Sequence, residues 1–277
     1  MSISRVQKQA IVGLLYVIIV GAVTIGVYDL ATPDATCTDG IQNQKEEGID
    51  CGTVCGVLCD PAPVAPQVKS TQLLAVGSGD YDVVSEIVNP NNIYGSSKIG
   101  YVITLTDQDG KLIASEPGVF YIAPAQTKFL VRSSIKAEPG AVSASIAITE
   151  AVWEKVTPDG LLVNFPLRRE SFTESRTPGA ASQFEGVVFN DSDFDFNTVD
   201  VVVVVLDANE KVLGVNTTEL RTVASRTERY FKVVWPTLLP GMPAKTRIQA
   251  GADLFSNENF IRRYGTQEKF QQYYEGR

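Results

Sequence analysis

The stretch that decides the fold is residues 199–213, VDVVVVVLDANEKVL, which resembles residues 99–113, IGYVITLTDQDGKLI, one hundred positions earlier. Each copy runs from a β-branched apolar segment through Asp-x-x-x-Lys into a second apolar segment, which predicts a strand, a tight Asx-type turn and a returning strand. In the earlier copy Tyr101, Ile103 and Leu105 point to one face and Thr104 and Thr106 to the other, so one face of that strand is predicted to be buried. The later copy is apolar on both faces, which predicts a central strand that is covered on both sides.

The repeat extends beyond this hairpin. Residues 87–92 (IVNPNN) correspond, with one gap, to residues 188–193 (VFNDSD), each a strand that ends in an Asn-rich loop. Short runs rich in Val, Ile, Thr and aromatic residues continue on both sides, separated by Gly, Pro, Asn and Asp. The sequence therefore predicts an all-β fold with two tandem immunoglobulin-like β-sandwiches, at 70–156 and 160–255.

An uncharged segment precedes these domains. Residues 10–28, AIVGLLYVIIVGAVTIGVY, would span about 28 Å as a helix, close to the thickness of a bilayer's hydrocarbon core. Arg5 and Lys8 precede this run and acidic residues follow it, so we expect one transmembrane helix with its N-terminus in the cytoplasm and the rest of the chain outside. A cleaved signal peptide is the main alternative, but Asp29 would lie three residues before the cut at Ala31, where small residues are preferred. A buried helix of a soluble protein is the third possibility.

All four cysteines lie in the acidic segment 29–60, with the spacing C-x13-C-x3-C-x3-C. They are Cys37, Cys51, Cys55 and Cys59. Outside the cytoplasm, an even number of clustered cysteines predicts disulfides, here two, and the spacing does not choose among the three pairings. A segment this short has no core of its own, so the disulfides would supply its order. A four-cysteine zinc site is the alternative, although the spacing differs from paired C-x2-C knuckles.

Oxygen-bearing side chains in the same segment indicate a second hypothesis, a calcium site. Hard oxygen ligands around glycine-kinked turns suit Ca²⁺, although the order of residues is not that of an EF-hand. The candidate ligands are Asp39, Asn43, Glu46 and Asp50. The alternative is that these are ordinary solvated residues in turns. No other cofactor is predicted.

The order C-x-D-G-I-Q-N-Q, then D-C-G and C, resembles a short cysteine motif of bacterial surface proteins, which implies a prokaryotic cell-surface setting and no particular activity. The repeated β pattern resembles the FxLYD-type family of bacterial immunoglobulin-like domains over residues 72–152 and 166–255. This resemblance implies a seven-stranded sandwich with an envelope or binding role and no conserved active site. The chain departs from the family at Thr106 and Leu206, which replace the tyrosine before the turn aspartate.

The segments between and after the domains have simple interpretations. Three prolines in residues 61–69 predict an extended spacer between the cysteine segment and the first sandwich. Trp153 and Trp235 are interpreted as core or domain-junction residues. The tail, 256–277, is rich in Phe and Tyr, and a docked short helix or a frayed end is expected there.

Composition limits the function. The net charge of −8 argues against a nucleic-acid partner, which would require a basic surface. The absence of histidine removes Ser-His and Cys-His nucleophile pairs and imidazole metal sites. We therefore expect no enzyme. The remaining catalytic alternative is a carboxylate pair of the glycosidase type, for which the candidates are Asp80, Asp82, Glu185 and Asp193.

The expected function is that of a membrane-anchored, extracytoplasmic, non-enzymatic surface or envelope protein. Its β-sandwiches would mediate binding or adhesion to an unknown protein or glycan. The alternative is a structural subunit of a membrane-associated assembly such as a pilus or a secretion apparatus.

Overall fold

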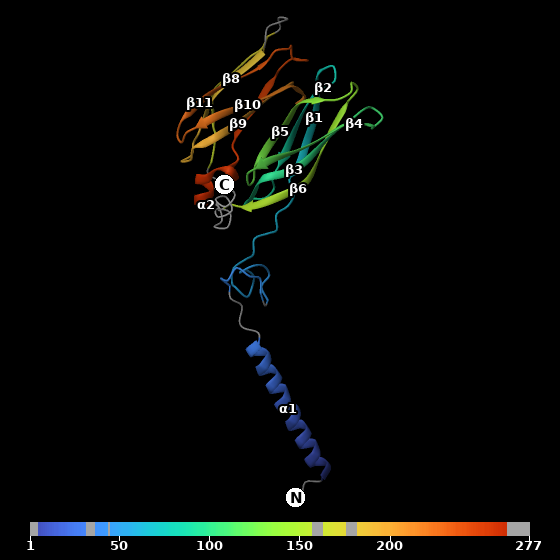
Figure 1. Ribbon diagram of the computed structural model, residues 1–277, viewed down its shortest axis with the longest axis vertical. Coiled ribbons are helices and arrows are strands. Elements are labelled where there is room, and N and C mark those ends of the chain that lie inside the picture. The colour runs from blue at the N-terminus through green and yellow to red at the C-terminus, as the bar shows by residue number, and fades with distance from the viewer. Residues whose placement is uncertain (1–4, 32–36, 44, 157–162, 176–181, 265–277) are drawn as a thin grey trace. The chain divides into compact units, whose positions relative to one another are not determined.

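The computed structural model describes the chain except for residues 1–4, 32–36, 44, 157–162, 176–181 and 265–277. The chain divides into two compact units, Met1–Ala62 and Pro63–Arg277, each described by itself below. Most of their elements are labelled in Figure 1.

The first unit begins with helix α1 (Arg5–Ala31). Within it, Gln7–Tyr28 has a mean hydropathy of 2.6, and its side chains are not buried by the protein. Thr24 donates its hydroxyl to the carbonyl of Val20 (2.8 Å), so this polar group is satisfied inside the helix. By length and composition, α1 is long and apolar enough to span a membrane.

The second unit begins with a sandwich of two antiparallel three-stranded sheets. One sheet has the order β1-β2-β5 and the other β4-β3-β6. The strands are β1 (Gln67–Gly77), β2 (Asp80–Val88), β3 (Tyr94–Thr106), β4 (Leu112–Ile122), β5 (Thr127–Lys136) and β6 (Ser143–Lys155). Tyr101, Ile103 and Leu105 of β3 are buried against β2, as their alternation predicts, and Trp153 packs partly buried on this core.

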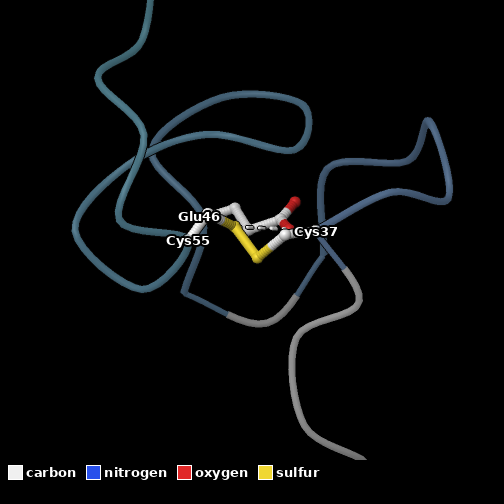
Figure 2. Close-up of side chains that lie close together, drawn as sticks. All are labelled: Cys37, Glu46 and Cys55. Atoms are coloured by element: carbon white, nitrogen blue, oxygen red, sulfur yellow. Dashed lines mark hydrogen bonds between the residues drawn. A yellow bond between two sulfur atoms is a disulfide. The ribbon is translucent and has the colours of Figure 1, made fainter.

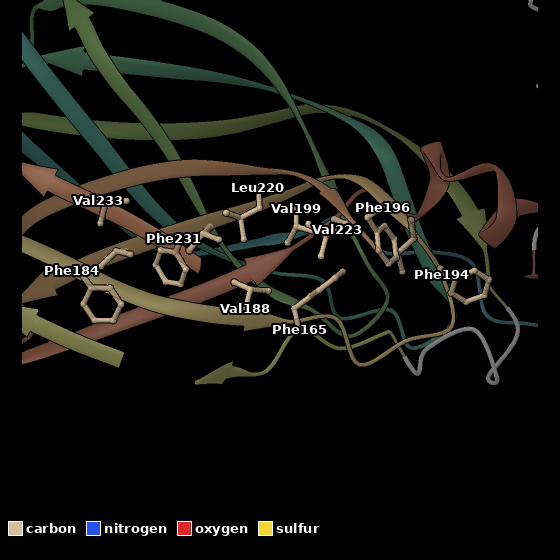
Figure 3. Close-up of a cluster of buried hydrophobic side chains, with 14 of the residues drawn as sticks. Phe165, Phe184, Val188, Phe194, Phe196, Val199, Leu220, Val223, Phe231 and Val233 are labelled. Atoms are coloured by element: carbon tan, nitrogen blue, oxygen red, sulfur yellow. The ribbon is translucent and has the colours of Figure 1, made fainter. Parts of the chain in front are cut away.

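A second sandwich repeats the arrangement, with the sheets β11-β8-β7 and β10-β9-β12. Its strands are β7 (Leu167–Thr173), β8 (Ser182–Phe189), β9 (Phe196–Leu206), β10 (Val212–Val223), β11 (Glu228–Trp235) and β12 (Lys245–Gly251). Figure 3 shows its core, where rings such as Phe184 and Phe231 stack between strands (centroids 6.0 Å apart). Trp235 belongs to this core.

The chain then forms a short 3-10 helix η2 (Leu254–Ser256) and helix α2 (Glu258–Tyr264). Phe260 of α2 is buried and meets the ring of Phe194 edge-on at 5.7 Å. This part of the tail is therefore docked on the second sandwich, and residues 265–277 lie outside the described residues.

The predicted fold class is confirmed: the chain is all-β and sandwich-like, with one N-terminal apolar helix and a small module that holds two disulfides. Each sandwich has six strands among the described residues, whereas the family resemblance implied seven. The segment interpreted as a spacer is also shorter than expected. Val64 exchanges hydrogen bonds with the side chain of Asn91 (2.8 and 2.7 Å), and β1 already begins at Gln67.

The two sandwiches share their turn chemistry. Oδ1 of Asp107 accepts the backbone N–H of Lys111 (2.9 Å), and Oδ1 of Asp207 accepts that of Lys211 (2.9 Å). These are the Asx-type turns predicted from the repeated Asp-x-x-x-Lys.

A buried asparagine ties two loops together in each sandwich. Nδ2 of Asn89 donates to the carbonyls of Tyr94 (2.7 Å) and Ala123 (2.9 Å). In the second sandwich Nδ2 of Asn190 donates to the carbonyl of Phe194 (2.7 Å) in the same way. Both asparagines are almost fully buried, so these bonds satisfy backbone groups that water does not reach.

Strand β9 explains how the sandwiches pack together. Val201, Val203 and Val205 point into the second core, whereas Val204 and Leu206 belong to a different buried cluster, with Leu74, Val84, Val212 and Val215. The outer face of sheet β1-β2-β5 therefore packs against the outer face of sheet β10-β9-β12. The predicted two-sided burial of β9 is confirmed, and the first sandwich supplies the second cover.

Candidate functional site

The cysteine module is held by two crossed disulfides. Cys37 pairs with Cys55 and Cys51 with Cys59, with Cα atoms 5.6 and 5.0 Å apart. The cysteines are therefore oxidised, and the thiolates that a zinc site would need are absent from this module. The sequence had left this pairing open.

Three of the candidate calcium ligands lie together in this module. The carboxylate of Asp50 accepts the backbone N–H groups of Asp39 (3.1 Å) and Gly40 (2.9 Å), and Asp39 accepts Nδ2 of Asn43 (2.9 Å). These oxygens are thus engaged in folding the loop, with Asp50 itself at a positive φ of 54°. The calcium site stays a prediction.

The fourth candidate, Glu46, lies against a disulfide. Figure 2 shows its side chain beside Cys37 and Cys55. One carboxylate oxygen lies 3.3 Å from Sγ of Cys55, and the other accepts the backbone N–H of Asn43 (3.1 Å). Glu46 is buried, and its role in the structure is to order the loop around the Cys37–Cys55 link.

Thr53, directly after the turn at Gly52, has a specific partner. Its hydroxyl donates to Oε1 of Glu47 (2.7 Å), and its backbone N–H donates to the same oxygen (3.2 Å). These two bonds lower the pKa of the Glu47 carboxyl, because they favour its charged form. Thr53 and Glu47 therefore stabilise this turn together.

We call the contact between the two sandwiches the seam. Hydrogen bonds accompany its apolar cluster: Oε1 of Gln249 accepts the backbone N–H of Phe129 (2.9 Å), and Nε2 of the same side chain donates to the carbonyl of Thr127. Arg247 reaches Glu86 across the seam (3.5 Å). A cavity of about 220 Å³ remains at this edge, lined by Ser70, Val84, Glu86, Phe129, Val204, Leu206, Glu210, Val212 and Arg247.

One turn at the seam has an unusual backbone. Glu210 has a φ of 62°, at the position where the first sandwich has Gly110 with a φ of 77°. Its carbonyl accepts Nε2 of Gln72 (3.2 Å), and its carboxylate binds Lys245 (3.0 Å) and Arg247 (2.6 Å). These contacts hold a non-glycine residue in the left-handed region, where it is strained.

The other edge of the seam is polar. Tyr121 of β4 donates its hydroxyl to Asp200 of β9 (2.7 Å), and Nζ of Lys128 lies 3.3 Å from the centre of the Tyr121 ring. Burial lowers the pKa of Lys128 to about 8, although Asp200 and Asp253 oppose this shift. Burial likewise raises the pKa of Asp253. A polar cluster of ionisable groups thus joins the two sandwiches.

Among the residues that the structure describes, none packs over the outer face of sheet β11-β8-β7 around Tyr230. Tyr230 is 59% exposed and donates its hydroxyl to Glu185 (2.7 Å). Arg168 (2.8 Å) and Arg169 both bind the carboxylate of Glu228. A shallow hollow of about 510 Å³ lies between them, lined by Arg169, Glu185, Val187, Glu228 and Tyr230. We call these five residues the open hollow.

The structure does not gather the four candidate catalytic carboxylates. Asp80 pairs with Lys136, and Asp82 accepts the backbone N–H of Ser134 (2.8 Å) while burial raises its pKa; both lie in the first sandwich. Glu185 binds Tyr230 and Asp193 pairs with Arg226 (2.9 Å), in the second sandwich. Each carboxylate therefore has its own partner on its own sandwich.

Sequence reasoning missed most of the open hollow and the polar edge of the seam. Of these residues it had singled out Glu185 alone, in a different role. The missed signal was the repeat itself. With Asn89 matched to Asn190, the exposed Tyr230 falls at the position of Phe129, which contacts the other sandwich. Tyr230 thus places a hydroxyl where the first sandwich has the apolar Phe129, and an alignment of the two repeats can detect this difference.

Comparisons with known proteins give no family. No family model matches the chain, and no curated protein matches it. Among solved structures, the chain is similar to a red sea bream transglutaminase, with 11% identity over 72% of this chain and a TM-score of 0.23. The match spans 30% of the length of that protein, and at this TM-score the likeness carries no argument.

Proposed function

We propose that the chain is a membrane-anchored extracytoplasmic protein that binds an envelope or surface partner through its pair of β-sandwiches, without catalysing a reaction. The anchor is α1, whose uncharged run at residues 10–28 suits a lipid environment. Arg5 and Lys8 before the apolar run and the acidic segment 29–60 after it favour a cytoplasmic N-terminus.

The observation that carries the extracytoplasmic location is the pair of disulfides, Cys37–Cys55 and Cys51–Cys59. Disulfides form and persist in oxidising compartments and are rare in the cytosol. They directly follow α1 in the sequence, so the helix and the disulfides support the same topology.

Binding, as opposed to catalysis, is supported by two features. The chain has no histidine, and the carboxylates weighed as a catalytic pair are engaged separately. In addition, the seam fixes the two sandwiches against each other, which gives a rigid support for a recognition surface, and rigidity lowers the entropic cost of binding.

The topology can be tested with the full-length chain in its membranes. A membrane-impermeant maleimide polymer would be applied to intact cells before and after reduction. We expect no labelling before reduction and labelling of four cysteines after it, because the thiols are oxidised and outside. The variant with all four cysteines changed to serine is the control. Four thiols that react without reduction, and only after the cells are opened, would contradict the proposed location.

A further inference from the structure

We propose that the open hollow on sheet β11-β8-β7 is a binding site for a neutral carbohydrate, with the Tyr230 ring as the platform for a sugar face. This inference rests on the proposed binding function and names its ligand class. It is carried by the side chains of the hollow and by the difference between the two equivalent sheets.

The equivalent sheet of the first sandwich shows what this face does when it binds protein. There Val84 and Phe129 are apolar and belong to, or pack against, the buried cluster of the seam. In the second sandwich the same positions hold Glu185 and Tyr230. The face has thus kept an aromatic ring, with Glu185 and Lys232 in place of Val84 and Val131. Directly across from the ring the change is the reverse, from Glu86 to Val187. A ring with an apolar neighbour and hydrogen-bonding groups beside it suits a hydroxyl-rich ligand with apolar C–H faces better than another sandwich.

The ring is fixed and accessible. Tyr230 lies directly across from Val187 of β8, which forms an apolar floor, and its hydroxyl is held by Glu185. An exposed ring that is already oriented loses little conformational freedom on binding. Sugars present apolar C–H faces that stack on such rings, and their hydroxyls take hydrogen bonds from the polar groups at the rim.

The opposite wall is built by a β-bulge. The register of β7 against β8 shifts between Arg168 and Ser171, and Arg169 has a φ of 52°. Bulges redirect side chains, and here the result is that two successive residues, Arg168 and Arg169, both reach Glu228. A non-glycine residue in this backbone region is strained, and such strain is typical of sites that position side chains for binding.

The charges of this wall define the ligand class. The carboxylates of this surface already have partners: Glu228 is bound by Arg168 and Arg169, and Glu185 is bound by the Tyr230 hydroxyl and lies across from Lys232 on β11. Guanidinium groups donate hydrogen bonds and carboxylates accept them, which together match a hydroxyl that does both. A uronic acid or a phosphorylated sugar would have to displace Glu228 from its two arginines, whereas a neutral hydroxyl can share these hydrogen bonds, so a neutral sugar fits better.

The test uses the full-length chain in lipid nanodiscs and four probes. The neutral probes are a glucose tetramer, a mannose trimer and an N-acetylglucosamine tetramer, and the acidic probe is a galacturonic acid trimer. Binding is measured by saturation-transfer NMR and titration. We expect at least one neutral probe to bind and the acidic probe not to bind. Tyr230→Ala should weaken binding about tenfold or more, and Tyr230→Phe should weaken it less, because the ring remains.

Thr217→Ala, at an exposed position of β10 outside the hollow, is the matched control and should bind like the unmodified chain. Unchanged thermal unfolding of every variant shows that binding, not folding, is compared. The proposal is overturned if no neutral probe binds at about 10 mM, if the acidic probe binds more tightly, or if Tyr230→Ala binds as well as Thr217→Ala. Since cysteine labelling tests the location independently, a negative sugar result with oxidised, external cysteines would reject the sugar and leave the proposed function standing.

Discussion

The sheet β1-β2-β5 of the first sandwich and the sheet β11-β8-β7 of the second occupy equivalent positions in the repeat. The outer face of the first is buried against the other sandwich, whereas no described residue covers the outer face of the second. Val84 of the first is buried in the seam, whereas Glu185 at the equivalent position lies on an open face. The inner cores are both apolar, so the difference lies in the outer faces alone. The same strand pattern can therefore form either an apolar docking surface or a polar outer surface, as in the terminal repeats of repeat proteins.

The largest effect is expected when the residue types at the equivalent positions Val84 and Glu185 are exchanged. Val84→Glu should destabilise the chain by about 3–5 kcal/mol, because it buries a further carboxylate beside Glu86, where Arg247 is already bound to two carboxylates. The reciprocal change, Glu185→Val, should alter the stability by less than about 1 kcal/mol, since that face is solvated. Urea unfolding of the full-length variants measures both. Equal effects would mean that the seam does not bury Val84.

The buried asparagines should behave alike in both sandwiches, because they lie below the faces that differ. Asn89→Ala and Asn190→Ala should each cost about 2–3 kcal/mol, as each leaves buried carbonyl groups without a donor. Urea unfolding of the two variants side by side is the measurement. A cost below about 0.5 kcal/mol for either variant would show that its loops do not depend on the asparagine.

The smallest expected effect concerns the polar edge of the seam, through Lys128. Its pKa in the folded chain is about 8, below the ordinary value of 10.5, so folding disfavours its charged form. The charged Lys128 therefore lowers the free energy of unfolding below pH 8, and this loss of stability diminishes as the pH rises toward 10.5. Lys128→Met should remove this penalty and be more stable than the parent at pH 7 by about 1–2 kcal/mol.

The difference in free energy of unfolding between the parent and Lys128→Met separates the effect of Lys128 from that of the neighbouring Tyr121, whose pKa is raised by burial and by Asp200. We expect the advantage of Lys128→Met to shrink between pH 8 and pH 10 in thermal or urea unfolding. An advantage that is constant across this range, or a less stable variant at pH 7, would show that Lys128 is not disfavoured in its charged form.

The sequence predicted the individual strands and turns but not which surfaces pack against one another. The alternation in β3, the two-sided apolar run of β9 and the Asp107 and Asp207 turns were all predicted, because these signals are local and repeated. The sequence could not predict which surface buries the outer face of β9, since any apolar surface could do so.

The candidate sites were predicted less well for the same reason. Four cysteines indicated two disulfides, but pairing depends on the path of the whole loop, including the contacts of Glu46 and Asp50. The open hollow escaped notice because Tyr230, Glu185 and Arg169 come from three strands and form no contiguous motif. Aligning the repeats position by position would have exposed the change from Phe129 to Tyr230.

The central claim is that equivalent outer faces are closed in one sandwich and open in the other. It is tested most directly by single cysteines at the matched positions, Val84→Cys and Glu185→Cys, in the full-length chain, whose own cysteines are oxidised. We expect a thiol reagent to label position 185 rapidly and position 84 only when the chain unfolds. Rapid labelling of both positions would contradict it.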